Sequence, residues 1–169
     1  MDVRHFTVAQ VMSRTLVTVT PDESPLIAWE IMRRAVLHHL PVVEDGGGLR
    51  GVLSRAELAA TWSGGPAEQS RVRVGDLLGG QRCPHVPPDA RLADAAAAML
   101  RAGIDAIPVV RAGTDTVPVL GQGGIVVGMV TATDVLRAVA GQITVEEGPS
   151  ETMTGMFRLV PVLPHAPQA

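Results

Sequence analysis

Two stretches of the chain decide the fold: Val19-Thr20-Pro21-Asp22 and, 67 residues later, Val86-Pro87-Pro88-Asp89. At the same spacing Pro41-Val42-Val43 lies over Pro108-Val109-Val110, and 10 of the 29 residues from 15 to 43 are identical to their counterparts. Further along, the spacing becomes 77, where residues 51–57 lie over residues 128–134. Similarity at a fixed period is typical of a tandem repeat. The chain therefore contains two copies of one structural unit, and the second copy carries an insertion of ten residues.

Each copy predicts the same order of elements, β-α-β-β-α. A short apolar run at residues 16–19, weaker around residue 86, precedes a helix. In the first copy Ser24 is typical of a helix N-cap and Pro25 of a first turn, whereas alanine dominates the helix expected near residues 92–101. Apolar, β-branched runs after each helix predict buried strands, and a further strand ends at Ser54 or Thr131, where a second helix begins. The sequence therefore predicts a mixed α/β fold.

Composition divides the chain into four parts. We expect the first repeat at residues 6–62 and the second at residues 72–141, joined by a linker at residues 63–71 that is rich in Ser, Gly and Pro. The repeat pattern stops near residue 141. Residues 142–169 form a Pro-rich C-terminal tail, which we expect to be extended or disordered unless it docks on a partner.

Charge and composition exclude several classes of protein. Hydrophobic residues make up 46% of the 169 residues, which is enough for a buried core, and the formal net charge is −3. This charge and the four aromatic residues do not match the basic surface and stacking platforms of nucleic-acid binders. A single cysteine excludes an intrachain disulfide, and no apolar run approaches the ~18 residues of a membrane span or forms a signal-peptide core. We expect a cytoplasmic protein that binds neither nucleic acid nor membrane.

In both copies a hydroxyl residue at a helix start is followed three positions later by an acid: Ser54 with Glu57, and Thr131 with Asp134. One interpretation is a capping box, in which the hydroxyl caps the helix and the acid reaches back to the cap amide. The other is a ligand site, because a helix N-terminus attracts phosphate and a carboxylate accepts hydrogen bonds from vicinal ribose hydroxyls. Gly51 and Gly128, at the start of the preceding strands, would let the backbone approach a ligand closely. The residues alone leave both interpretations open.

The run of Met32, Leu40-Pro41-Val42-Val43 and Gly51-Val52-Leu53-Ser54, repeated in the second copy, resembles a tandem pair of CBS (cystathionine β-synthase) domains over residues 6–141. The resemblance implies two repeats packed sheet to sheet around a pseudo-two-fold axis, with two symmetry-related clefts between them. It also implies adenosine-containing ligands in those clefts and the pairing of modules into homodimers.

The resemblance assigns one nucleotide site to each copy. In the second copy Asp134 matches the acid that holds the ribose hydroxyls, and Thr131 matches the hydroxyl residue near ribose and phosphate. This site comprises His85, Val86, Ile107, Pro108, Thr131 and Asp134. The corresponding site of the first copy comprises Thr18, Val19, Leu40, Pro41, Ser54 and Glu57. Glu57 is one methylene longer than the usual Asp, and because a displaced carboxylate forfeits hydrogen bonds worth ~1.5–3 kcal/mol each, we expect this site to be weaker.

No catalytic constellation is apparent: Lys is absent, and we find neither a Ser/His/Asp set nor paired carboxylates, so we do not expect an enzyme. His38-His39 suggests a metal pair, but adjacent residues of an extended segment point to opposite faces. We therefore expect no metal and no cofactor, and a place beside a ligand phosphate is the better interpretation of these histidines. Arg55, next to Ser54, could reach a phosphate, although a solvated side chain is the favoured interpretation.

Two functions fit these observations. The first is a regulatory module that senses AMP, ADP, ATP or S-adenosylmethionine, as an energy sensor does, and signals to an unidentified protein target or through its own dimer. The second is a structural dimerisation module whose capping boxes are only caps and whose nucleotide sites are degenerate and unoccupied. Binding of an adenosine compound separates the two.

Overall fold

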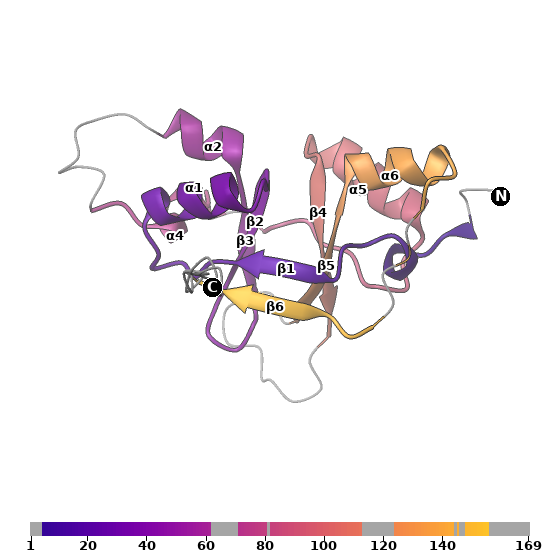
Figure 1. The fold of residues 1–169 in the computed structure, drawn as a ribbon, viewed down its shortest axis with the longest axis horizontal. Helices are drawn as coiled ribbons and strands as arrows, with labels where there is room; N and C mark the ends of the chain where they lie inside the picture. The colour runs from indigo at the N-terminus through magenta and orange to yellow at the C-terminus, as the bar shows by residue number, and fades with distance from the viewer. Residues whose placement is uncertain are drawn as a thin grey trace, which may run out of the picture.

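The computed structural model describes residues 5–61, 71–80, 82–112, 124–143, 145 and 148–155. The two repeats stand side by side, each with helices packed against a hairpin of strands, and β1 and β6 lie crosswise to both hairpins (Figure 1). The elements of the first repeat are β1 (Thr15–Thr18), α1 (Pro25–Arg34), β2 (His39–Val43), β3 (Leu49–Ser54) and α2 (Arg55–Ala60). Those of the second are α5 (Leu92–Ala102), β4 (Ala106–Arg111), β5 (Ile125–Thr131) and α6 (Ala132–Val139). None of the helices within the described residues has the length and apolar character needed to cross a membrane.

Local sequence signals explain where the first helix begins and how the hairpins pair. Ser24 caps α1, its Oγ accepting a hydrogen bond from the Ile27 amide at 3.2 Å, and Pro25 occupies the first turn as predicted. β2 pairs with β3 and β4 with β5, both antiparallel, and each ladder shifts register at the same place, after Val42 and after Val109. The two repeats therefore share even their irregularities, as expected of a duplication.

The described residues before Val86 form no counterpart of β1, although Val86 keeps the single bridge to its hairpin that Val19 makes with Val42 in the first repeat. Val86 makes a single parallel bridge with Val109, and the other described residues from 82 to 90 extend this ladder no further. Three prolines lie in this segment, at positions 84, 87 and 88. Because proline has no amide hydrogen, it cannot donate to a strand ladder.

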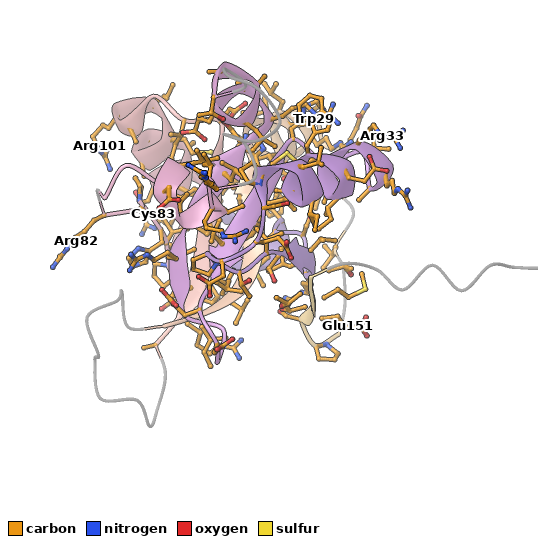
Figure 2. All side chains as sticks on the ribbon, turned by 90° about the vertical axis from the view of Figure 1, so that its left-hand side faces the viewer. Trp29, Arg33, Arg82, Cys83, Arg101 and Glu151 are labelled. Carbon is orange, nitrogen blue, oxygen red and sulfur yellow. The ribbon has the colours of Figure 1, made fainter. Side chains whose placement is uncertain are left out.

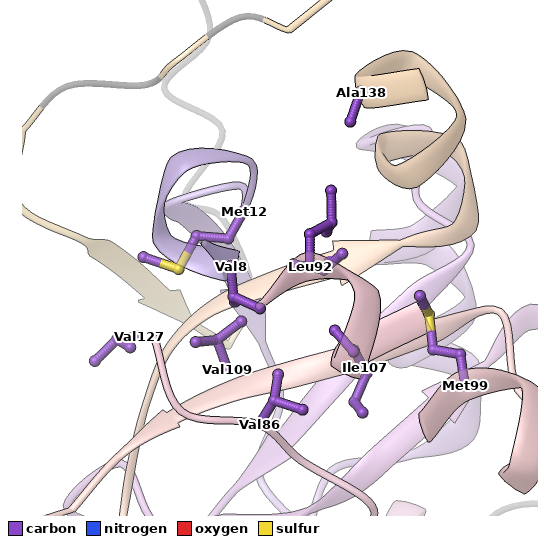
Figure 3. Close-up of a cluster of buried hydrophobic side chains, with 11 residues drawn as sticks. Val8, Met12, Val86, Leu92, Met99, Ile107, Val109, Val127 and Ala138 are labelled. Atoms are coloured by element: carbon purple, nitrogen blue, oxygen red, sulfur yellow. The ribbon is translucent and has the colours of Figure 1, made fainter. Parts of the chain in front are cut away.

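Each repeat completes its core with a segment that precedes the other repeat in the chain. The short 3-10 helix η2 (Val8–Gln10) packs on the second repeat, where Val8 is fully buried (Figure 3). The helix α4 (Val74–Leu77) packs on the first repeat, where Val74 is fully buried. Neither repeat therefore has a complete core without a segment from outside its own β-α-β-β-α unit.

The backbone hydrogen bonds that attach η2 to the second repeat and α4 to the first repeat are equivalent. The amide of Val8 donates to the carbonyl of Ala90 at 2.8 Å, and the amide of Val74 donates to the carbonyl of Glu23 at 2.9 Å. Ala90 and Glu23 are 67 residues apart and hold the same place in their repeats. A pseudo-two-fold axis thus relates the two halves, as the resemblance implied.

The two hairpins face each other across a shared apolar core. Its buried side chains are Leu16, Val43, Leu49, Ala106, Val110, Val126 and Met129. Strand side chains alternate between the two faces of a hairpin. On the opposite face, Leu40 and Ile107 therefore point to the helices of their own repeats. The predicted sheet-to-sheet packing of an α/β pair is therefore confirmed.

Part of the expected tail is a strand of this fold. β6 (Glu151–Thr154) pairs in parallel with β1, and the hydroxyl oxygens of Thr18 and Thr154 lie 2.7 Å apart. Just before β6, the Ser150 hydroxyl donates to the carbonyl of Val127 in the second repeat at 2.5 Å. The segment from Ser150 through β6 thereby contacts both repeats. Most of the predicted linker, most of the insertion and residues 156–169 of the tail lie outside the described residues.

Gly51 and Gly128, which we expected to admit a ligand, instead make room for the exchanged segments. A Cβ on Gly51 would lie 3.0 Å from Cδ2 of Leu78, and a Cβ on Gly128 would overlap Sδ of Met12. Leu78 follows α4 and Met12 follows η2. Each glycine is therefore explained by the close approach of a side chain from the segment that completes its repeat.

The substitution Gly128→Ala should lower the free energy of unfolding by ~1–3 kcal/mol, because the added methyl group overpacks the core against Met12. Denaturant unfolding followed by circular dichroism measures the loss. Gly79→Ala is the matched control, since a Cβ at Gly79 meets no atom within 4 Å. An unchanged unfolding midpoint in Gly128→Ala, or an equal loss in both variants, would contradict this packing.

Candidate functional site

A cavity of about 580 Å³ lies between the two repeats. Small-molecule sites usually have volumes of ~300–1,000 Å³. The first repeat contributes β1 together with His38, His39 and Pro41, and the second contributes Asp105 and the residues around Thr131 at the start of α6. The wall is thus built by both halves of the chain.

Thr131 and Asp134 form a capping box on this wall. Asp134 Oδ2 accepts hydrogen bonds from the Thr131 amide at 2.8 Å and from Thr131 Oγ1 at 2.7 Å, and the Asp134 amide donates to Thr131 Oγ1 at 3.3 Å. Asp134 Oδ1 lies 3.6 Å from a guanidinium nitrogen of Arg137, and the Asp134 side chain is 13% exposed. The cap uses one carboxylate oxygen and leaves Oδ1, beside Arg137, outside the cap.

Ser54 and Glu57 repeat the arrangement at the start of α2. Glu57 Oε2 accepts from the Ser54 amide at 2.8 Å and from Ser54 Oγ at 2.7 Å, and the Glu57 amide donates to Ser54 Oγ at 3.1 Å. The capping-box interpretation therefore describes both copies, and the extra methylene of Glu57 does not disturb the cap. Neither residue lines the cavity that contains Asp134.

Arg55, expected to be solvated, packs against α1. Its guanidinium carbon lies 5.6 Å from the ring centre of Trp29, and Nη2 donates to the carbonyl of Met32 at 3.3 Å. A guanidinium over an indole ring at a partly exposed position stabilises a fold by ~0.5–1 kcal/mol. Arg55 thereby ties the first turn of α2 to α1.

The two histidines lie where the repeats meet. His39 Nε2 is 2.7 Å from Asp105 Oδ1, and this contact joins the first repeat to the second. The His39 side chain is 13% exposed and that of Asp105 is 76% exposed. His38 also lines the cavity, contrary to the expected alternation, because it precedes β2 and is not part of the extended strand. Within the described ranges, no three His, Cys, Asp or Glu side chains are grouped to hold a metal ion.

The structure brings together only part of the set predicted for the second copy. Thr131 and Asp134 line the cavity, whereas four further members do not: His85, Val86, Ile107 and Pro108. His85 is exposed, and its Nδ1 lies 3.1 Å from the carbonyl oxygen of Cys83. Val86, Ile107 and Pro108 are buried. The cavity beside Asp134 is completed by the first repeat rather than by these residues of the second.

The set predicted for the first copy is divided in the same way. Thr18, Val19 and Leu40 are fully buried in the first repeat, and only Pro41 lines the cavity. Pro41 therefore meets Thr131 and Asp134, which were predicted for the other site. The spacing within a repeat fixes which residues share a hairpin, but it does not reveal which repeat faces that hairpin across the axis.

Two further residues of the cavity were missed by the sequence reasoning. Arg137 lies one helical turn after Asp134, so the spacing of three on a predicted helix could have identified it. Asp105 precedes β4 and meets a histidine 66 residues away in the chain. No local pattern indicates such a contact.

Cys83 holds the position in the second repeat that Leu16 holds in the first. Burial raises the pKa of the Cys83 thiol to about 11, and the carboxylate of Glu57 adds to the rise. In Figure 2, Cys83 lies against the body of the molecule while the neighbouring Arg82 extends away from it. Cys83 is thus near Glu57, just as Leu16 shares the cavity with Asp134.

The Cys83 thiol should react slowly with a disulfide reagent such as Ellman's reagent at neutral pH. A pKa of about 11 against an ordinary value of 9.0 leaves roughly 100-fold less thiolate, which is the reacting form. The rate should rise with pH through the alkaline range, and denaturant-unfolded protein provides the control with an ordinary thiol. Labelling of the folded protein as fast as that of the unfolded chain would contradict the burial of Cys83.

Solved structures of CBS domain proteins share this fold. The structure of CBSX2 in complex with AMP is 28% identical, with a TM-score of 0.64, over 80% of this chain and 97% of that chain. The cytosolic domain of the Mg²⁺ channel MgtE in complex with ATP is 26% identical, with a TM-score of 0.57, over 75% of this chain and 46% of that chain. The CBS domain pair of protein MJ0100 was solved in complex with 5′-methylthioadenosine and S-adenosyl-L-methionine. It is 22% identical, with a TM-score of 0.64, over 79% of this chain and 99% of that chain.

The search of curated proteins finds no match to this sequence. The family described as the CBS domain matches residues 8–63 and residues 74–141. These segments cover most of the chain, and one lies in each of the two repeats related by the pseudo-two-fold axis. The chain therefore belongs to the CBS domain family, as a tandem pair.

Proposed function

We propose that this chain is a regulatory module that binds an adenosine-containing nucleotide in the cavity between its two repeats. The observation that carries the proposal is the position of Thr131 and Asp134 on one wall with His39 and Pro41, from the other repeat. A carboxylate oxygen outside the helix cap accepts hydrogen bonds from the vicinal hydroxyls of a ribose. The candidate ligands are AMP, ADP, ATP and S-adenosylmethionine.

Two of the similar structures support a nucleotide as the class of ligand. CBSX2 is in complex with AMP, and the cytosolic domain of MgtE is in complex with ATP. The choice of residues rests instead on the cavity of this chain, which places a carboxylate, a hydroxyl and a histidine around one space.

The apolar part of the cavity suits an adenine ring. Val17, Val36, Leu37 and Pro41 line it, all from the first repeat. Small-molecule sites typically combine such apolar walls with a few polar groups that fix the orientation of the ligand. We place the base against these side chains and the ribose beside Asp134.

Regulation would follow from the position of the site between the repeats. A ligand shifts a conformational equilibrium only through unequal affinity for the two states. A ligand that contacts both repeats favours the arrangement in which both walls are in place. A protein target, or a second copy of the chain, would read this arrangement.

A second and weaker site around Ser54 and Glu57 belongs to the same proposal. Cys83 lies near Glu57 and holds the position in the second repeat that Leu16, which lines the cavity beside Asp134, holds in the first. Residues of the second repeat would then complete this site, as residues of the first repeat complete the one at Asp134.

The substitution Asp134→Ala should weaken AMP binding by ~1–3 kcal/mol, because charge-assisted hydrogen bonds to the ribose are lost. Calorimetric titration of the full chain measures the change. Ser24→Ala is the control, since it removes the N-cap of α1, worth ~0.5–2 kcal/mol of stability, without touching this cavity. Equal AMP affinity in Asp134→Ala and wild type would show that Asp134 only caps α6.

A role in dimerisation has its own supporting observation. α5 and α6 contact each other, and three large apolar side chains on them are exposed: Leu100 at 84%, Leu136 at 67% and Val139 at 63%. Large exposed apolar side chains on neighbouring helices favour contact with another protein surface. We propose a second copy of the chain as the partner, which also suits the alternative function as a dimerisation module.

The substitution Leu136→Glu should shift the chain from dimer to monomer in analytical ultracentrifugation, because a buried charge in the interface has no partner. Met153→Glu, at a 45% exposed position on β6, is the control and should leave the dimer unchanged. A wild-type chain that sediments as a monomer at all tested concentrations would contradict the proposed dimer.

A further inference from the structure

The cavity between the repeats is poor in positive charge. Among the residues that the structure describes, the charged ones that line it are Asp105, Asp134 and Arg137, which sum to a formal charge of −1 with His38 and His39 counted as neutral. Arg137 is 62% exposed and already lies 3.6 Å from Asp134 Oδ1. The guanidinium that could meet a phosphate is therefore shared with a carboxylate.

Three of the donors at the start of α6 are also engaged. The amide of Ala132 donates to the carbonyl of Asp105 at 2.8 Å. The amide of Asp134 donates to Thr131 Oγ1, and the Thr131 hydroxyl donates to Asp134 Oδ2. Phosphate binding at a helix start relies on amide and hydroxyl donors that point at the ligand. Here several of those donors are used within the protein.

An adjoining hollow of about 460 Å³ offers no better place for a chain of phosphates. It shares Ser13, Asp134 and Arg137 with the cavity. Its remaining lining residues are uncharged: Val11, Met12, Gln142 and Ile143. A 5′ substituent that extends from the ribose into this hollow meets the same Asp134–Arg137 pair and no additional cation among the described lining residues.

We propose, on the basis of the nucleotide site proposed above, that this cavity selects adenosyl compounds whose 5′ substituent is neutral or cationic and discriminates against nucleoside polyphosphates. A neutral thioether requires no counter-charge. A sulfonium or ammonium group gains from the carboxylate of Asp105, which is 76% exposed and contacts His39 Nε2 through Oδ1. A triphosphate places several negative charges beside two carboxylates and one shared guanidinium, and like charges at close range repel.

The test is a calorimetric titration of the full chain with 5′-methylthioadenosine, S-adenosylmethionine, AMP and ATP, without added divalent cations. We expect 5′-methylthioadenosine or S-adenosylmethionine to bind at least about tenfold more tightly than ATP. A tenfold difference in Kd corresponds to about 1.4 kcal/mol of repulsion between the triphosphate and the cavity. Added salt should narrow the difference, because ions screen the repulsion.

Two variants test whether the discrimination against ATP depends on charge at the cavity. Asp105→Asn should raise ATP affinity about two- to fivefold, the range expected for removal of an exposed charge, and this gain should exceed any change in 5′-methylthioadenosine affinity. Asp94→Asn removes an exposed carboxylate of α5 that does not line the cavity, and it should change neither affinity. Thermal unfolding checks that both variants are folded.

The outcomes separate this inference from the function on which it rests. ATP binding as tight as 5′-methylthioadenosine, or tighter, would overturn the charge selection and leave the nucleotide site standing. Failure of all four compounds to bind would overturn the nucleotide site and the selection together. An equal gain in ATP affinity in Asp94→Asn and Asp105→Asn would show a general effect of net charge and would also overturn the selection.

Discussion

The reciprocal burial of Val8 and Val74 is the constraint on which the rest of the structure depends. Each valine is fully buried in the repeat that does not follow it directly in the chain, so both cores require both halves. Two units that complete each other in this way cannot drift apart without exposing apolar surface, which costs ~25 cal/mol per Å². The two walls of the cavity are therefore held near each other by both cores, although no single repeat contains the site.

The repeats, the order of their elements and the cap at Ser24 could be predicted, because they depend on periodicity and on residue types that act locally. The residues that meet across the pseudo-two-fold axis could not be predicted. Leu40 and Ile107 were placed in sites on the strength of the strand that carries them, but strand alternation points both to their own helices. Gly128 was attributed to a ligand, whereas its neighbour is Met12 from a segment more than a hundred residues away.

The capping and binding interpretations of the Thr131 and Asp134 pair are compatible, because a carboxylate has two oxygens. Oδ2 completes the cap and fixes the side chain in one rotamer, while Oδ1 stays outside the cap beside Arg137. A side chain that is already ordered loses little conformational entropy when a ligand binds. The helix cap thus prepares the proposed ribose contact. It also uses donors that a phosphate would need, so one local interaction bears on both affinity and selectivity.

The central claim is that one ligand occupies a space bounded by both repeats. Hydrogen–deuterium exchange of the full chain, with and without saturating AMP, tests it most directly. The account predicts slower exchange in two separate segments, around β2 in the first repeat and around the start of α6 in the second, with the same dependence on AMP concentration. Slower exchange confined to one repeat, or no change in either segment despite measurable binding, would contradict it.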